Sequence, residues 1–218
     1  MGCLNPDVTK CVAGAAGRSL SALALLVAAL LSPAAAQTGG HEHRQHGSAP
    51  APPRYTRTVA SYAPPDVTLT GAGGERVKLA SVLGREGPVM LQFIFTTCPT
   101  VCPVLSATFA AAQSRLGPES ERVTMVSISI DPEHDTPERL REYARRFKAG
   151  PRWLFLTGEL NDIVSIRKAF DAYPGDDKMR HQPLTFLRPG PGRPWVRLDG
   201  LLSAAQLLGE YARAAEQQ

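Results

Sequence analysis

Two nearly uninterrupted apolar runs dominate the pattern of hydrophobic positions: VMLQFIF at residues 89–95 and VTMVSISI at residues 123–130. Runs of this length are typical of β-strands that are covered on both faces. We therefore expect both segments to be buried strands in the middle of a sheet.

Weaker periodic patterns predict the other elements around these two strands. Helices are predicted at residues 103–116, 136–147, 160–170 and 203–215, and further strands at 66–69, 76–79, 153–156, 184–187 and 195–198. The first two of these strands flank the turn Gly71-Ala72-Gly73-Gly74 and form an N-terminal hairpin. Strands that alternate with helices indicate an α/β fold with a mixed central sheet flanked by helices. The order is that of a thioredoxin-like fold with an added N-terminal hairpin.

The segment after the second buried strand carries two aspartates that need an interpretation. Asp135, with Pro137 and Glu138 after it, matches the start of a helix with a capping box. Asp131 ends the strand just before Pro132. We interpret both side chains as structural rather than as functional carboxylates.

The first 36 residues have the pattern of a secretory signal peptide. Lys10 and Arg18 precede an apolar run at residues 19–31, and small residues follow as far as Ala36, where we expect cleavage. An uncleaved membrane anchor is the alternative, but at ~1.5 Å per residue this run reaches only about 20 Å of the ~30 Å hydrocarbon core. Cys3 and Cys11 lie before the run without a lipidation box, so a lipoprotein is not expected. The sequence predicts an exported, periplasmic protein, membrane-associated only if this segment is retained.

Residues 37–60 have the Gly, Pro and Ala content of a flexible tether, which leaves residues 61–218 as the folded domain. The tether contains the His-rich tract His41, His43 and His46. Such a tract can bind Cu(II), Ni(II) or Zn(II) loosely, as an auxiliary site, or can be an incidental polar tail.

Composition excludes some functional classes. With 218 residues, 43% hydrophobic and 20% charged, the chain can build one well-buried domain, which we expect to be monomeric. The formal net charge is only +4, and the basic residues are spread along the chain, so no nucleic-acid partner is expected. Cleavage of the signal peptide would leave one cysteine pair, Cys98 and Cys102.

Cys98 and Cys102 lie where a buried strand turns into a helix. Backbone N–H groups and the positive end of a helix dipole stabilise a thiolate at such a place. Cysteines four residues apart can form a disulfide, chelate a metal or do both in turn. Thioredoxin-type oxidoreductases have two intervening residues rather than three, which weakens a purely redox interpretation. A permanent disulfide would close too short a loop to stabilise the fold much.

A metal site built on two thiolates needs a third ligand. His181, just before the strand at 184–187, is the best candidate, and His134 is the reserve. Two thiolates and an imidazole select copper or zinc, and three-coordination suits Cu(I), whereas structural zinc normally takes four ligands.

Three separated motifs resemble the Sco/SenC family of copper-binding assembly factors. They are FTTCPTVCP at residues 95–103, SISIDPEHDTP at residues 127–137, and His181 before a strand, and the resemblance spans roughly residues 62–215. It implies that Cys98, Cys102 and His181 bind one copper ion, Cu(I) or Cu(II), and that the protein helps to build the dinuclear copper centre of cytochrome c oxidase. Family members commonly have Asp directly before this histidine, whereas this chain has Arg180, with Asp176 and Asp177 further back.

Two functions follow from this resemblance and from the dithiol. The first is a copper metallochaperone that receives copper from another copper carrier and delivers it to the copper-bearing subunit of the oxidase. The second is a thiol–disulfide oxidoreductase that reduces the copper-site cysteines of the oxidase while Cys98 and Cys102 form a disulfide. Metal chelation needs His181 and disulfide exchange does not, so this residue discriminates between them. A peroxiredoxin-type peroxidase is a weaker third interpretation.

Overall fold

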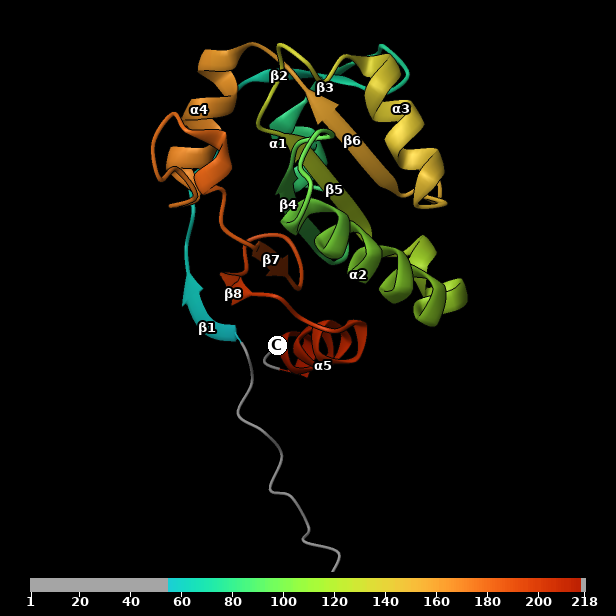
Figure 1. Cartoon of the computed structure of the whole chain (residues 1–218). Helices are drawn as coiled ribbons and strands as arrows, with labels where there is room; N and C mark the ends of the chain where they lie inside the picture. The colour runs from blue at the N-terminus through green and yellow to red at the C-terminus, as the bar shows by residue number, and fades with distance from the viewer. Residues whose placement is uncertain (1–54, 217–218) are drawn as a thin grey trace, which may run out of the picture. The chain divides into compact units, whose positions relative to one another are not determined.

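An eight-stranded sheet runs through residues 55–216, the part of the chain that the computed structural model describes (Figure 1). Its strands are β1 (Tyr55–Ala60), β2 (Thr68–Gly71), β3 (Arg76–Lys78), β4 (Val89–Ile94), β5 (Thr124–Ser129), β6 (Trp153–Thr157), β7 (Leu184–Arg188) and β8 (Trp195–Gly200). The helices are α1 (Leu79–Leu83), α2 (Val101–Leu116), α3 (Pro137–Arg146), α4 (Leu160–Ala169) and α5 (Ala204–Glu216), with 3-10 turns η1 (Gly117–Glu121) and η2 (Lys178–Arg180).

The strand order in the sheet is β1-β8-β7-β4-β5-β6-β2-β3. β5 pairs in parallel with β4 and with β6, and every other pair in this sheet is antiparallel. The sheet is therefore mixed, with β4 and β5 at its centre, as the two apolar runs predict. The predicted thioredoxin-like α/β fold and its N-terminal hairpin, β2–β3, are confirmed.

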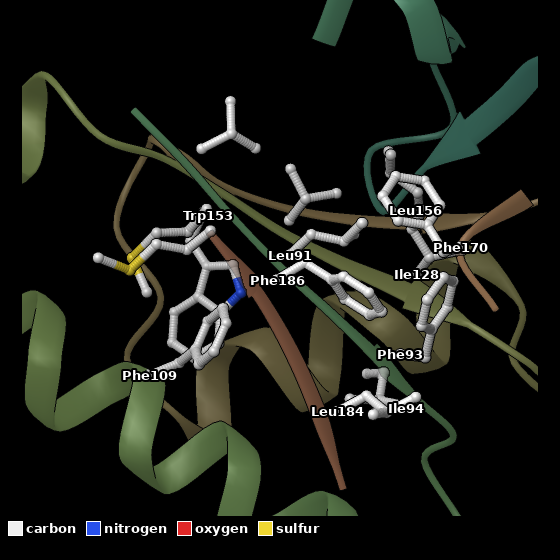
Figure 2. Close-up of a cluster of buried hydrophobic side chains, with 14 of the residues drawn as sticks. Leu91, Phe93, Ile94, Phe109, Ile128, Trp153, Leu156, Phe170, Leu184 and Phe186 are labelled. Atoms are coloured by element: carbon white, nitrogen blue, oxygen red, sulfur yellow. The ribbon is translucent and has the colours of Figure 1, made fainter. Parts of the chain in front are cut away.

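Successive side chains of β4 point to opposite faces of the sheet. Phe93 packs on one face, with its ring centroid 6.2 Å from that of Phe170 and 6.0 Å from that of Phe186 (Figure 2). Gln92 points to the other face, toward Ser106 of α2. β4 is thus covered on both sides, and its end carries the chain toward α2.

The folded region begins earlier than the sequence predicts. The expected tether at residues 37–60 is wrong over its last six residues, because Tyr55–Ala60 form β1 and pair with β8. The Tyr55 hydroxyl donates to Glu210 of α5, and Arg57 forms an ion pair with the same carboxylate, both at 2.8 Å. These partners lie some 150 residues further along the chain, so local composition does not reveal the strand. The predicted signal peptide and the rest of the tether lie outside the described residues.

Two other boundaries differ from the prediction. The strand predicted at 76–79 stops at Lys78, because the short helix α1, which the sequence pattern did not reveal, begins at Leu79. α2 begins at Val101 instead of residue 103, which places Cys102 in its first turn. Between residues 55 and 216, no helix combines the length and the apolar character needed to cross a membrane.

Candidate metal site

The two cysteines lie in the loop of residues 95–100 between β4 and α2, called the cysteine loop below, and in the first turn of α2. Cys98 lies in this loop and Cys102 is the second residue of α2, with exposed fractions of 8% and 0%. The backbone N–H of Cys102 donates to the Cys98 sulfur, and the N–H of Phe95 donates to the Cys102 sulfur, both at 3.4 Å. Both residues are free thiols.

The two thiols have opposite electrostatic surroundings. Burial raises the pKa of Cys98, but hydrogen bonds from the backbone of Cys102, Thr100 and Val101 and from the Cys102 side chain outweigh burial, so that its pKa falls below the ordinary value. Burial dominates at Cys102 and raises the pKa of its thiol well above that of a free cysteine. Cys98 is therefore the thiol that more readily becomes the thiolate, the form that attacks disulfides and binds soft metals.

His181 follows η2 and leads into β7. Its Nε2 lies 2.9 Å from the carbonyl oxygen of Phe93, and its ring centroid lies 6.4 Å from that of Phe95. Burial lowers the pKa of His181 to about 4, opposed by the bond to Phe93 and assisted by the nearby positive charge of Arg167. A carbonyl only accepts, so Nε2 carries the proton and Nδ1 of the neutral ring carries the lone pair.

The three predicted ligands approach the same end of β4, because the segment Phe93–Phe95 contacts both Cys102 and His181. They do not form a closed site: among residues 55–216, no three His, Cys, Asp or Glu side chains lie close enough together to hold a metal ion. Two thiols and a neutral imidazole nevertheless fit Cu(I), which prefers soft donors and low coordination numbers.

The other histidines hold different positions. His134 is 55% exposed, and its Nδ1 lies 3.5 Å from the carboxylate of Asp131, so it faces that carboxylate. His41, His43 and His46 lie outside the described residues. Of the histidines in the described region, His181 is therefore the one with a contact to the cysteine-bearing loop.

The interpretation of Asp135 as a helix cap is wrong. Thr136 is the N-cap of α3, and its hydroxyl accepts a hydrogen bond from the backbone N–H of Arg139. The buried carboxylate of Asp135 instead accepts hydrogen bonds from the backbone N–H and the hydroxyl of Thr96, and from the hydroxyl of Ser129. Asp135 thus fastens the start of the cysteine loop to the end of β5.

Asp131 has a corresponding role toward the segment of residues 170–183 between α4 and β7, which carries His181 and is called the histidine loop here. Its carboxylate lies 2.5 Å from the ammonium of Lys178, three residues before His181. The same ammonium lies 5.8 Å from the centre of the Phe95 ring. The short segment between β5 and α3 therefore braces both ligand-bearing loops, Asp135 the cysteine loop and Asp131 the histidine loop. Sequence reasoning missed Lys178, since nothing in its local pattern indicates a distant carboxylate.

A buried hydrogen-bond network joins β4 and β5 to α2, α3 and β6 next to the site. The Gln92 side chain donates to Ser127 at 2.9 Å and to Ser106 at 3.4 Å. Ser106 is also bonded to the Tyr143 hydroxyl at 3.1 Å, and Trp153 donates to Ser127 at 2.9 Å. The signal in the sequence was Gln92, because a polar side chain inside an apolar strand needs buried partners.

The carboxylates near Arg180 are engaged locally. Asp177 accepts a hydrogen bond from the backbone of Met179 and caps η2, and Asp176 is hydrogen bonded to Tyr173. Arg180 itself is exposed. Neither aspartate takes the place that the resemblance gives to a residue directly before His181.

Comparisons with known proteins agree with this arrangement. The SCO1/SenC family matches residues 58–216. A SCO1 homologue of Bacillus subtilis is 32% identical over 127 residues, which are 55% of this chain and 65% of that relative. The structure of BsSco, described as a member of the Sco family of cytochrome c oxidase assembly proteins, has a TM-score of 0.61 at 27% identity and covers 75% of this chain and 99% of that one.

A second solved structure, Arabidopsis thaliana ScoI with copper bound, also has 27% identity, with a TM-score of 0.60 over 73% of this chain and all of that one. The family match extends from within β1 to the end of α5, so it includes the cysteine loop, the segment between β5 and α3, and the histidine loop. The chain belongs to the SCO1/SenC family.

Proposed function

We propose that this protein is a copper metallochaperone that binds one copper ion through Cys98, Cys102 and His181 and delivers it to the dinuclear copper centre of cytochrome c oxidase. The observation that carries the proposal is the meeting of the cysteine loop and the histidine loop at the end of β4. The copper-bound relative and the oxidase assembly role stated for BsSco support it.

The chemistry of the site suits capture and release. A site of two thiolates and one imidazole holds Cu(I) tightly enough to carry it, and its low coordination number leaves room for a ligand of the acceptor. His181 can provide Nδ1 while Nε2–H stays bonded to Phe93, an outer bond of the kind that orients metal-binding histidines.

The proposal also requires that the protein and the oxidase subunit meet in the same compartment. The signal-peptide pattern of residues 1–36 would place the domain in the periplasm, where the copper-bearing part of an oxidase can be reached. We propose that subunit as the acceptor and another copper carrier as the donor.

A thiol–disulfide oxidoreductase is the second candidate. The observation in its favour is the contrast between a Cys98 whose pKa is lowered and a buried Cys102 whose pKa is raised. The Cys98 thiolate would attack the disulfide formed by the copper-site cysteines of the oxidase, breaking it and forming a mixed disulfide with one of them. Cys102, on losing its proton, would then attack the Cys98 sulfur, which forms the Cys98–Cys102 disulfide and releases both substrate cysteines as thiols.

Copper binding and oxidase assembly together separate the two candidates. The reduced protein should bind about one Cu(I) per chain, and His181→Ala should weaken this binding sharply, as should Cys98→Ser and Cys102→Ser. In a strain lacking the protein, His181→Ala should fail to restore oxidase activity at low copper. Full activity with His181→Ala but none with Cys98→Ser would establish the reductase instead.

A further inference from the structure

A groove of about 780 Å³ lies between the cysteine loop and α3. The course of both segments can be followed in Figure 1. Its lining comes from the two threonines before Cys98 and from one face of α3: Thr96, Thr97, Arg139, Glu142, Tyr143, Arg145 and Arg146. The groove is not part of the metal site, but one of its walls is the loop that carries Cys98.

Hydrogen bonds connect the groove to the cysteine-bearing elements. The Tyr143 hydroxyl is bonded to Ser106 of α2, the helix in which Cys102 occupies the first turn. Thr96 is held by Asp135, just before α3. These bonds fix the position of α3 relative to Cys98, so a molecule in the groove would lie at a fixed distance from the thiol.

The charge of the groove is strongly positive. Arg139, Arg145 and Arg146 are exposed, and Glu142 is the one acidic side chain in the lining. Within residues 55–216, none of these three arginines lies at ion-pair distance from a carboxylate. The Arg146 guanidinium lies 5.8 Å from the centre of the Phe147 ring, a contact that leaves its positive charge uncompensated. The three guanidinium groups, which have no carboxylate partner within residues 55–216, are therefore available to carboxylates from another molecule.

The requirements of direct copper exchange indicate which molecule would bind in the groove. A ligand of the other protein must reach the copper while Cys98 still holds it, so the other protein must cover the surface around Cys98. Thr97, the neighbour of Cys98, is exposed and lines the groove. A protein that exchanges copper at this site therefore also meets the arginines of α3.

We infer that the groove between the cysteine loop and α3 docks an acidic segment of the copper acceptor, the copper-bearing subunit of the oxidase. This inference rests on the proposed function for the identity of the partner, and on the charge of the groove for the chemistry of the contact. Carboxylates paired with Arg139, Arg145 and Arg146 would orient the partner's metal site toward Cys98 and speed its association.

The test compares two triple variants with the same change in charge. Arg139→Gln, Arg145→Gln and Arg146→Gln neutralise the groove, and Gln keeps the helix propensity of α3. Arg76→Gln, Arg115→Gln and Arg141→Gln neutralise three exposed arginines that do not line it. Association of the reduced, metal-free protein with the soluble copper-bearing domain of the oxidase subunit is measured by surface plasmon resonance at low and high salt.

We expect the groove variant to lower the association rate constant at least about tenfold at low salt, and the control variant to lower it less than about twofold. The difference should shrink at high salt, because exposed charges are screened. Glu142→Gln should raise the rate, since it removes the opposing charge. An octaglutamate peptide should inhibit association with the wild-type protein and have little effect on the groove variant.

Equal rates for the two triple variants would overturn the inference. The inference would also be overturned if inorganic phosphate, at equal charge, inhibited association as strongly as the peptide does. Inhibition by phosphatidylglycerol vesicles and not by the peptide would overturn it as well, since either result would indicate another ligand. Cu(I) stoichiometry is measured separately for each protein and should be the same in all. A wild-type protein that binds no copper, yet associates through the groove, would refute the metallochaperone and retain the acidic docking site.

Discussion

His181 donates a hydrogen bond through Nε2 to the carbonyl oxygen of Phe93, at 2.9 Å. This contact joins the histidine loop to the strand that leads to Cys98. It also fixes the tautomer, because the proton must be on the nitrogen that faces a carbonyl.

We expect copper to bind His181 through Nδ1. In ¹⁵N-labelled protein, Cu(I) loading should move the Nδ1 resonance of His181 strongly while Nε2 keeps its proton. His134 is a built-in control, since the Nδ1 resonance of its exposed ring should not move on Cu(I) loading. Loss of the Nε2 proton on copper loading would show instead that the bond to Phe93 breaks and that the loop rearranges.

The burial of His181 predicts that the metal-free protein loses stability in mild acid. The pKa of His181 falls from 6.5 to about 4 in the folded protein, so between these values the unfolded chain binds a proton that the folded protein does not. This contribution is fully present above about pH 6.5 and is lost as pH falls toward 4, by roughly 3 kcal/mol. Urea unfolding at a series of pH values measures it.

The matched variants for this experiment are His181→Gln and His134→Gln. The first should flatten the pH dependence of the unfolding free energy between pH 6.5 and 4, and the second should leave it in place. An unchanged slope in His181→Gln would mean that other groups cause the loss.

Unequal thiol reactivity is expected in the metal-free, reduced protein. Cys98 in the Cys102→Ser variant should react with iodoacetamide at pH 7 at least about tenfold faster than Cys102 in the Cys98→Ser variant. The reason is that backbone N–H groups stabilise the Cys98 thiolate, whereas burial disfavours that of Cys102. Mass spectrometry of timed samples measures both rates, and equal rates would contradict the assigned surroundings.

Lys178 should affect copper affinity without being a ligand. Its ion pair with Asp131 holds the loop before His181, so Lys178→Met should weaken Cu(I) binding by about 1 kcal/mol, close to fivefold. Lys178→Arg should restore most of the affinity, and Lys168→Met, at an exposed position of α4, should have little effect. Competition with a chromophoric Cu(I) chelator measures these affinities, and equal losses in both Met variants would exclude the positioning role.

Sequence patterns predicted those parts of the molecule whose cause is local. The apolar runs around Leu91 and Val126 marked the central strands, and the position of Cys98 and Cys102 between a strand and a helix marked the reactive loop. Burial on both faces leaves a continuous apolar signal that needs no knowledge of the partner strand.

Contacts between distant segments could not be predicted in the same way. Asp135 matches a helix cap in its local sequence, yet its carboxylate is taken by Thr96, 39 residues earlier. The ion pair of Asp131 with Lys178 spans 47 residues. The local sequence predicts hydrogen bonds of such side chains to the neighbouring backbone, but in the folded protein they bind distant partners instead.

The pairing of β1 with β8 has a consequence for how the chain acquires its fold. Tyr55 lies opposite Gly200, so the first described strand has no partner in the sheet until the last strand has been synthesised. Pairings between distant segments also form slowly, because a long loop must close before they stabilise anything. β1 can therefore join the edge of the sheet only when translation of the domain is nearly complete, and until then residues 55–60 lack the strand with which they pair in the folded protein.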